Sequence, residues 1–161
     1  MTNVVWLDKY NTGIAEIDTQ HIQIVDYLNQ LNDARLSGSP KKVKDVIDGI
    51  VDYTMSHFAF EEALMEQAEY PFLGPHKSIH ETFIKRVEKF QDRFKAGEDI
   101  ASECYDILKR WLVNHIQRDD SAYVRKVKAH LESLRKEEPP VTNAEPQGSW
   151  ISRAMKKFFS A

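Results

Sequence analysis

Five of the six histidines in this 161-residue chain occur at spacings that suit metal coordination. Imidazole and carboxylate groups are common ligands of transition metals in proteins. His57 and Glu61 are four residues apart, as are His76 and His80, so on a helix each pair would lie one turn apart on one face. The whole candidate set comprises five histidines and two carboxylates: His21, His57, Glu61, His76, His80, His115 and Asp120.

These polar residues interrupt stripes of apolar residues at helical spacing. A single helical histidine is usually solvated or hydrogen-bonded within a core. Burial of all these groups without partners would cost on the order of several kcal/mol, and the same stripes contain few opposite charges. Metal ions bind neutral imidazoles and carboxylates directly. The pattern therefore predicts a buried metal site that collects residues from several helices.

The number of ligands favours two ions over one. A single ion cannot accept seven protein ligands of this size, but two adjacent ions can share them. If both carboxylates bridge the ions, the five imidazoles divide as three and two. With a solvent-derived oxygen as a further bridge, the three-histidine ion is six-coordinate and closed. The two-histidine ion is then five-coordinate and keeps one open position.

Four long amphipathic segments with short connections must position these residues. This arrangement predicts an all-α, up-down-up-down four-helix bundle. The sequence predicts an irregular N-terminal arm over 1–17, followed by four helices. The first is capped at Asp18-Thr19-Gln20 and runs to about Leu36, and the second is capped by Ser39 and runs from Pro40 to about Gln67. The third runs from Gly74-Pro75 to Gly97, and the fourth from about Asp99 through His115 to Leu134.

The fourth segment contains a shift in helical phase. His115 and Asp120 are five residues apart, which on a regular helix separates them by about 140° around the axis. A π-bulge would realign them, and such bulges are frequent at functional sites. Tyr123 and Val127 continue the phase of Asp120, so we prefer Asp120 as the ligand. A regular α-helix here would make Asp119 the substitute.

The chain divides into three parts by composition. Residues 1–136 form the predicted bundle, residues 137–149 a proline-containing flexible linker, and residues 150–161 a short amphipathic tail. The tail has an apolar face and a basic face, which suits a membrane surface or a groove on a protein partner. A segment this short could also fray or fold back on the bundle.

Overall composition is ordinary for a folded, water-soluble protein, with 42% hydrophobic and 29% charged residues. The net charge of -3 gives no electrostatic reason to expect nucleic acid as a partner. No stretch approaches the roughly 18 apolar residues of a membrane span, and Asp8 and Lys9 lie where a signal peptide needs an apolar run. Cys104 is the single cysteine, so no internal disulfide can form. We therefore expect a cytoplasmic protein, with peripheral membrane contact through the tail as an option.

The ordered ligand pattern resembles that of the hemerythrin family. The resemblance covers roughly residues 4–125 and includes all seven candidate ligands. Flanking residues agree as well: Gly13-Ile14-x2-Ile17-Asp18-x-Gln20-His21 near the start, and Trp111-Leu112-x2-His115-Ile116 in the fourth helix.

The resemblance implies a non-haem centre of two iron ions with an oxo or hydroxo bridge, and reversible binding of dioxygen for transport, storage or delivery. By position, His76, His80 and His115 would hold the closed iron, and His21 and His57 the open one. Glu61 and Asp120 would bridge them. Trp111, Leu112 and Ile116 match family positions around the oxygen pocket, although they would also serve as ordinary core residues.

Two other functions remain open. One is a di-iron enzyme that acts on peroxide or nitric oxide; the other is an oxygen or redox sensor that acts through a partner. Di-iron enzymes of the ferritin-like type use Glu-x-x-His pairs and more carboxylates, and this chain contains no Glu-x-x-His. Five neutral imidazoles stabilise high-valent iron less well than carboxylates do, so the ligand set favours reversible binding over enzymatic oxygen cleavage.

Overall fold

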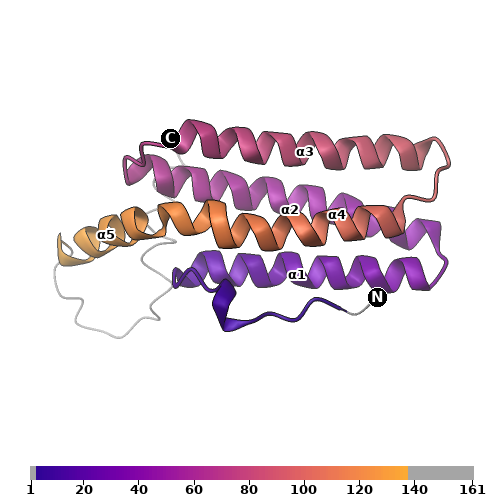
Figure 1. The fold of residues 1–161 in the computed structure, drawn as a ribbon, viewed down its shortest axis with the longest axis horizontal. Helices are drawn as coiled ribbons and strands as arrows, with labels where there is room; N and C mark the ends of the chain where they lie inside the picture. Colours follow the sequence, from indigo (N-terminus) through magenta and orange to yellow (C-terminus); the bar gives the residue numbers. More distant parts are fainter. Residues whose placement is uncertain (1–2, 138–161) are drawn as a thin grey trace.

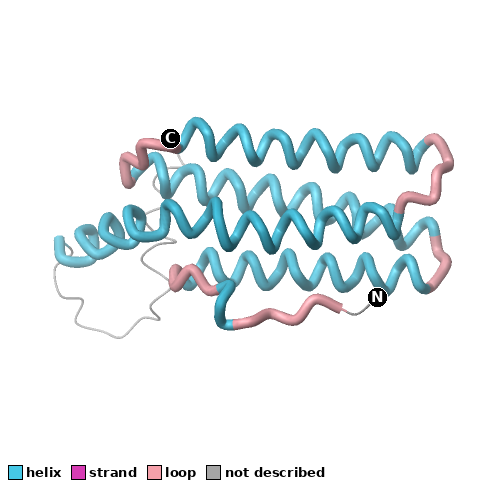
Figure 2. The backbone as a smooth tube through the Cα atoms, in the orientation of Figure 1, coloured by secondary structure: helices cyan, strands magenta, loops and turns pink. Residues whose placement is uncertain are grey.

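The computed structural model describes residues 3–137. Within this range four helical rods lie side by side, and the connecting loops alternate between the two ends of the molecule (Figures 1 and 2). The rods are α1 (Ala15–Leu36), α2 (Pro40–Gln67), α3 (Leu73–Lys95), and a composite fourth rod of α4 (Ala101–Asn114), η2 (His115–Asp120) and α5 (Ser121–Glu137). The predicted up-down-up-down bundle is confirmed. Glu137, the first residue of the predicted linker over 137–149, is instead the last residue of α5. The rest of the predicted linker and the tail lie outside the described residues.

Local sequence explains where several helices begin and end. Ser39 precedes α2, and its hydroxyl accepts a hydrogen bond from the Lys42 backbone N–H at 3.4 Å, with Pro40 at the first helical position. Gly38 and Gly97 follow α1 and α3 with φ angles of +64° and +89°, a conformation that glycine adopts without a steric cost.

No described helix is both long and apolar enough to cross a membrane.

The start of α1 differs from the prediction. The helix begins at Ala15 rather than after Asp18, and Ile14 is its N-cap residue. Asp18 instead lies in the first turn, where its carboxylate accepts hydrogen bonds from Thr12 N at 2.7 Å, Thr12 Oγ1 at 2.8 Å and Gly13 N at 2.9 Å. The aspartate therefore fixes the loop before the helix. Periodicity alone could not reveal this, because the loop conformation decides which N–H groups the side chain reaches.

The predicted N-terminal arm lies along α1 (Figure 1) and contains a short 3-10 turn, η1 (Asp8–Tyr10). Val4 exchanges two hydrogen bonds with the Asn29 side chain, at 2.8 and 3.0 Å, which fastens the arm to the helix. The other two predicted starts are also slightly displaced: α3 begins at Leu73 and α4 at Ala101.

The phase shift in the fourth rod occurs where the sequence predicted it. Residues His115–Asp120 form a π-helical turn between α4 and α5. This turn buries both His115 and Asp120, at 1% and 0% exposure, whereas the Asp119 side chain stays 33% exposed. The extra residue per turn therefore points two candidate ligands of different helical phase in the same inward direction.

The apolar core is divided into two clusters by a layer of buried polar residues. α1 passes from Ile17 in one cluster, through His21, to Ile24 in the other. The composite fourth rod does the same, with Ile116 and Tyr123 in different clusters on either side of Asp120. α2 shows the same order: Phe58, Glu61, Leu64. The polar layer is thus held between two packed apolar bodies.

We predict that Asp18→Ala lowers the free energy of unfolding by about 2 kcal/mol, since a carboxylate that accepts three hydrogen bonds is lost. Urea unfolding followed by circular dichroism would measure the change. Asp26→Ala, an exposed site on the same helix, is the matched control and should change stability little. Equal effects of the two substitutions would contradict the role assigned to Asp18.

Candidate metal centre

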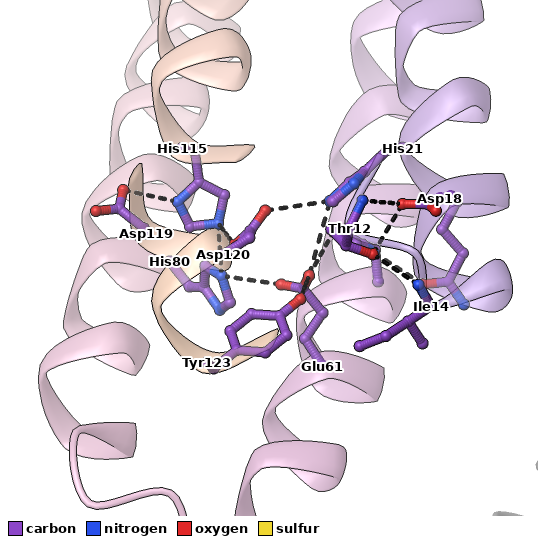
Figure 3. Close-up of polar contacts among 12 residues, drawn as sticks. Thr12, Ile14, Asp18, His21, Glu61, His80, His115, Asp119, Asp120 and Tyr123 are labelled. Atoms are coloured by element: carbon purple, nitrogen blue, oxygen red, sulfur yellow. Dashed lines mark hydrogen bonds and ion pairs between the residues drawn. The ribbon is translucent and has the colours of Figure 1, made fainter. Parts of the chain in front are cut away.

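The seven candidate ligands come together inside the bundle. His21 belongs to α1, His57 and Glu61 to α2, and the remaining four to α3 and the π turn. None of the seven is more than 4% exposed. Figure 3 shows Glu61 and Asp120 between His21 on one side and the imidazoles of His80 and His115 on the other.

The Glu61 carboxylate faces two separate pairs of imidazoles. Its Oε1 atom lies 3.7 Å from His21 Nε2 and 3.6 Å from His57 Nε2. Its Oε2 atom lies 3.9 Å from His76 Nε2 and 3.5 Å from His80 Nε2. One carboxylate thus presents one oxygen to each half of the site, which is the arrangement of a bridging ligand.

Asp120 also faces both halves of the site. Its Oδ1 atom lies 3.1 Å from His115 Nε2 and 3.6 Å from His76 Nε2, and its Oδ2 atom lies 3.3 Å from His21 Nε2. Asp119 points away from this centre and accepts a hydrogen bond from His115 Nδ1 at 3.0 Å. The geometry therefore favours Asp120 over Asp119 as the ligand.

The donor atoms form two overlapping groups. The atoms of Glu61, His76, His80 and His115 all lie within 4.8 Å of one another, as do those of His21, His57 and Glu61. Glu61 is common to both groups. Asp120 belongs to neither on this measure, but its two oxygens approach one group each. The division of imidazoles into three and two, expected from the sequence, matches this grouping.

Unsatisfied polar atoms test whether metal ions fit. Among the described residues, seven buried side-chain nitrogen or oxygen atoms have no hydrogen-bond partner. All seven belong to candidate ligands: His21 Nδ1 and Nε2, His57 Nε2, Glu61 Oε2, His76 Nε2, Asp120 Oδ1 and Oδ2. Buried polar atoms without partners are rare and costly. Six of the seven are atoms that face the centre, so cations at this position would satisfy them.

Electrostatics of the site also suit cations. Burial lowers the pKa of His21 and lowers that of His57 to about 3, so both imidazoles are neutral and can offer a lone pair. Burial and the charge of Glu61 raise the pKa of Asp120 well above its usual value. Two ionised carboxylates are therefore unfavourable here without positive charge.

Hydrogen bonds from Nδ1 orient three of the imidazoles. His57 Nδ1 bonds to Gln20 Oε1 at 2.8 Å, and His80 Nδ1 to Glu62 Oε1 at 2.8 Å. His115 Nδ1 bonds to Asp119, as described above, and this bond lowers the pKa of the Asp119 carboxyl. These bonds place the proton on Nδ1, so each Nε2 can offer its lone pair to a cation. The Nε2 atoms of His80 and His115 lie 3.1 Å from each other. The sequence pattern did not predict these roles, although all three acceptors lie within four residues of a candidate ligand.

Tyr123 also belongs to the site, a role that the sequence pattern did not predict. Its hydroxyl donates a hydrogen bond to Glu61 Oε1 at 2.5 Å, and its side chain is 0% exposed. Burial and the negative charge of Glu61 raise the pKa of Tyr123 well above its usual value, so the hydroxyl keeps its proton. Tyr123 thus holds the shared carboxylate in its orientation (Figure 3).

Aromatic rings pack against the three-histidine half. Phe58 stacks on His80 with ring centroids 3.8 Å apart, and Trp111 stacks on His115 at 4.3 Å. Trp111 is half-buried, while Leu112 and Ile116 are buried in the larger apolar cluster. Phe58 was not predicted as a site residue. The structure shows the three predicted pocket residues within or against the core, and their contact with dioxygen stays a prediction.

Comparison with known proteins agrees with this geometry. The family model of the hemerythrin HHE cation binding domain matches residues 12–127. A bacteriohemerythrin of Stenotrophomonas maltophilia is 50% identical over 159 residues, covering 99% of each chain, and one of Pseudomonas aeruginosa is 47% identical over the same length and coverage. A more distant bacteriohemerythrin, from Methylococcus capsulatus, is 30% identical over 71% of this chain and 88% of its own.

Solved structures agree as well. The crystal structure of a wild-type hemerythrin matches with a TM-score of 0.74 at 27% identity, covering 78% of this chain and 98% of that one. The family match, the close relatives and the buried cluster of histidines and carboxylates lead to one conclusion. The chain belongs to the hemerythrin family.

Proposed function

We propose that this protein binds dioxygen reversibly at a non-haem centre of two iron ions. The observation that carries the proposal is the position of Glu61, whose two oxygens each face a different group of imidazoles. A carboxylate between two groups of neutral nitrogen donors is suited to join two ions. Neutral imidazoles are good ligands for iron.

The proposed ligand assignment follows the two groups. His76, His80 and His115 would hold one ion, His21 and His57 the other, and Glu61 and Asp120 would bridge them. The ion held by His21 and His57 would have one imidazole fewer, so it would be the one that binds dioxygen. Two ferrous ions bound there would supply electrons to dioxygen and recover them on its release.

The residues around the ions have separate tasks in this proposal. Leu112 and Ile116 are buried and apolar, so they would exclude water from the bound ligand. Tyr123 keeps Glu61 oriented through its hydrogen bond. Gln20 and Glu62 hold their imidazoles with Nε2 turned inward. The donor set is poor in carboxylates, and this favours reversible binding over oxygen cleavage. Peroxide or nitric oxide chemistry is the competing outcome.

Substitution of single ligands should show, through the iron content per chain, that Glu61 binds both ions. We predict that wild-type protein holds two irons per chain, that Glu61→Ala holds almost none, and that His21→Ala keeps between one and two. Glu61 serves both ions, whereas His21 serves one. Elemental analysis after anaerobic loading with ferrous iron measures the content. His130→Ala, which removes the histidine outside the site, is the control. One metal per wild-type chain, or zinc alone in protein as isolated, contradicts the di-iron assignment.

Exposure to air should produce a reversible change in the visible spectrum. We predict that reduced, iron-loaded protein gains visible absorption with dioxygen, and loses it again when dioxygen is removed under vacuum or argon. The ligand set supports return to the reduced state. Repeated cycles on one sample measure reversibility. Oxidation that is complete after one exposure would contradict the proposal. Catalytic consumption of added peroxide or nitric oxide would indicate the enzymatic function instead.

The tail, residues 150–161, stays a separate proposal, as a docking element for an anionic membrane surface or a protein partner. The sequence supports it, because on a helix Trp150, Phe158 and Phe159 would share an apolar face, and Arg153, Lys156 and Lys157 would occupy the other face. We predict that deletion of residues 138–161 leaves iron content and spectrum unchanged but weakens sedimentation with anionic lipid vesicles, with the wild-type attachment falling as salt rises. Loss of iron or a lower melting temperature after deletion would show instead that the tail belongs to the fold.

A further inference from the structure

We propose that the two metal positions fill in a fixed order, three-histidine position first, because the hydrogen bonds behind the imidazoles are unequal. This inference rests on the proposed function, since it concerns the same pair of ions. Glu62 and Asp119 are then positioning residues that raise the metal affinity of the three-histidine half. The two-histidine position, where dioxygen would bind, has the lower affinity and is the one that exchanges metal.

Carboxylates support the three-histidine half. Glu62 Oε1 accepts from His80 Nδ1 at 2.8 Å, and Asp119 Oδ2 accepts from His115 Nδ1 at 3.0 Å. A carboxylate behind a ligating imidazole fixes the tautomer and makes Nε2 a more basic ligand. Lys77 lies 3.6 Å from the other Glu62 oxygen, but it is 41% exposed and therefore partly screened by solvent. Two of the three imidazoles in this half thus have a negatively charged partner.

The two-histidine half has no such support. His57 Nδ1 bonds to the Gln20 side chain at 2.8 Å, and an amide oxygen carries no net charge. His21 Nδ1 is buried and has no hydrogen-bond partner among the described residues. When Nε2 binds a metal, the neutral ring must carry its proton on Nδ1, where no residue within 3–137 accepts it. Nδ1 of His57 therefore bonds to a neutral amide, and Nδ1 of His21 has no hydrogen-bond partner among residues 3–137.

The bridging carboxylates cannot cause this difference. Glu61 and Asp120 approach both halves at similar distances, between 3.1 and 3.9 Å. The three-histidine half also has one imidazole more, which raises its metal affinity as Glu62 and Asp119 do. Substitutions that keep every ligand and change only the groups bonded to Nδ1 separate the contribution of the carboxylates from that of the extra imidazole. Glu62 and Gln20 are suited to this test, because Glu62→Gln and Gln20→Glu exchange charge with little change in shape.

The test is an anaerobic titration of the metal-free full-length protein with Co²⁺, which prefers ligands similar to those of ferrous iron. Native mass spectrometry counts chains with zero, one and two ions, and competition with a chelator gives both stepwise affinities. Wild-type protein should pass through a one-ion form. Glu62→Gln should weaken the first step roughly 10–100-fold and leave the second nearly unchanged. Gln20→Glu should tighten the second step by a similar factor.

A control variant tests whether loss of any nearby charge has the same effect. Glu66→Gln removes one charge from an exposed position on α2, the helix that carries Glu62, and should change the affinity of neither step. Asp119→Asn should weaken the first step as Glu62→Gln does, which provides a second test if one variant folds poorly by circular dichroism. Uptake of both ions in one step, or unchanged affinities in Glu62→Gln and Gln20→Glu, would overturn this inference and leave the di-iron proposal standing. No Co²⁺ binding at all would overturn both.

Discussion

The whole arrangement depends on one constraint: two carboxylates and five imidazoles lie buried in one layer of a helical bundle. Glu61 and Asp120 are both 0% exposed, and burial of two such groups together is costly without positive charge. Apolar packing on either side closes the layer to solvent but cannot satisfy it. Cations between the carboxylates would satisfy both the charge and the free nitrogen lone pairs.

This constraint explains features that have no other evident purpose. A continuous α-helix would stabilise the fourth rod at least as well as a π turn does, yet His115 and Asp120 could not then both face the centre. The Tyr123 hydroxyl donates its only proton to the Glu61 carboxylate rather than to a backbone carbonyl. The groups behind the imidazoles are of different kinds, from the carboxylate of Glu62 to the amide of Gln20. The two halves are therefore unequal in electrostatics as well as in the number of imidazoles.

The sequence predicted the bundle, the helix limits to within a few residues, and the residues that meet at the centre. Those features depend on periodicity along one helix, as in His76 and His80, or on a local phase shift, as between His115 and Asp120. The Nδ1 partners and the Tyr123 bond could not be predicted, because they depend on how neighbouring helices are rotated and shifted against one another. The role of Asp18 was missed for a related reason: the fold of the preceding loop brings the N–H groups to it.

A crystal structure of the iron-loaded, full-length protein tests the central claim most directly. The account predicts two ions roughly 3.5–4 Å apart, as in other two-metal sites, with Glu61 and Asp120 bound to both. His76, His80 and His115 should bind one ion and His21 and His57 the other, with one position left on the second. A single ion, a ligand set that includes Asp119 in place of Asp120, or Glu61 bound to only one ion would contradict it.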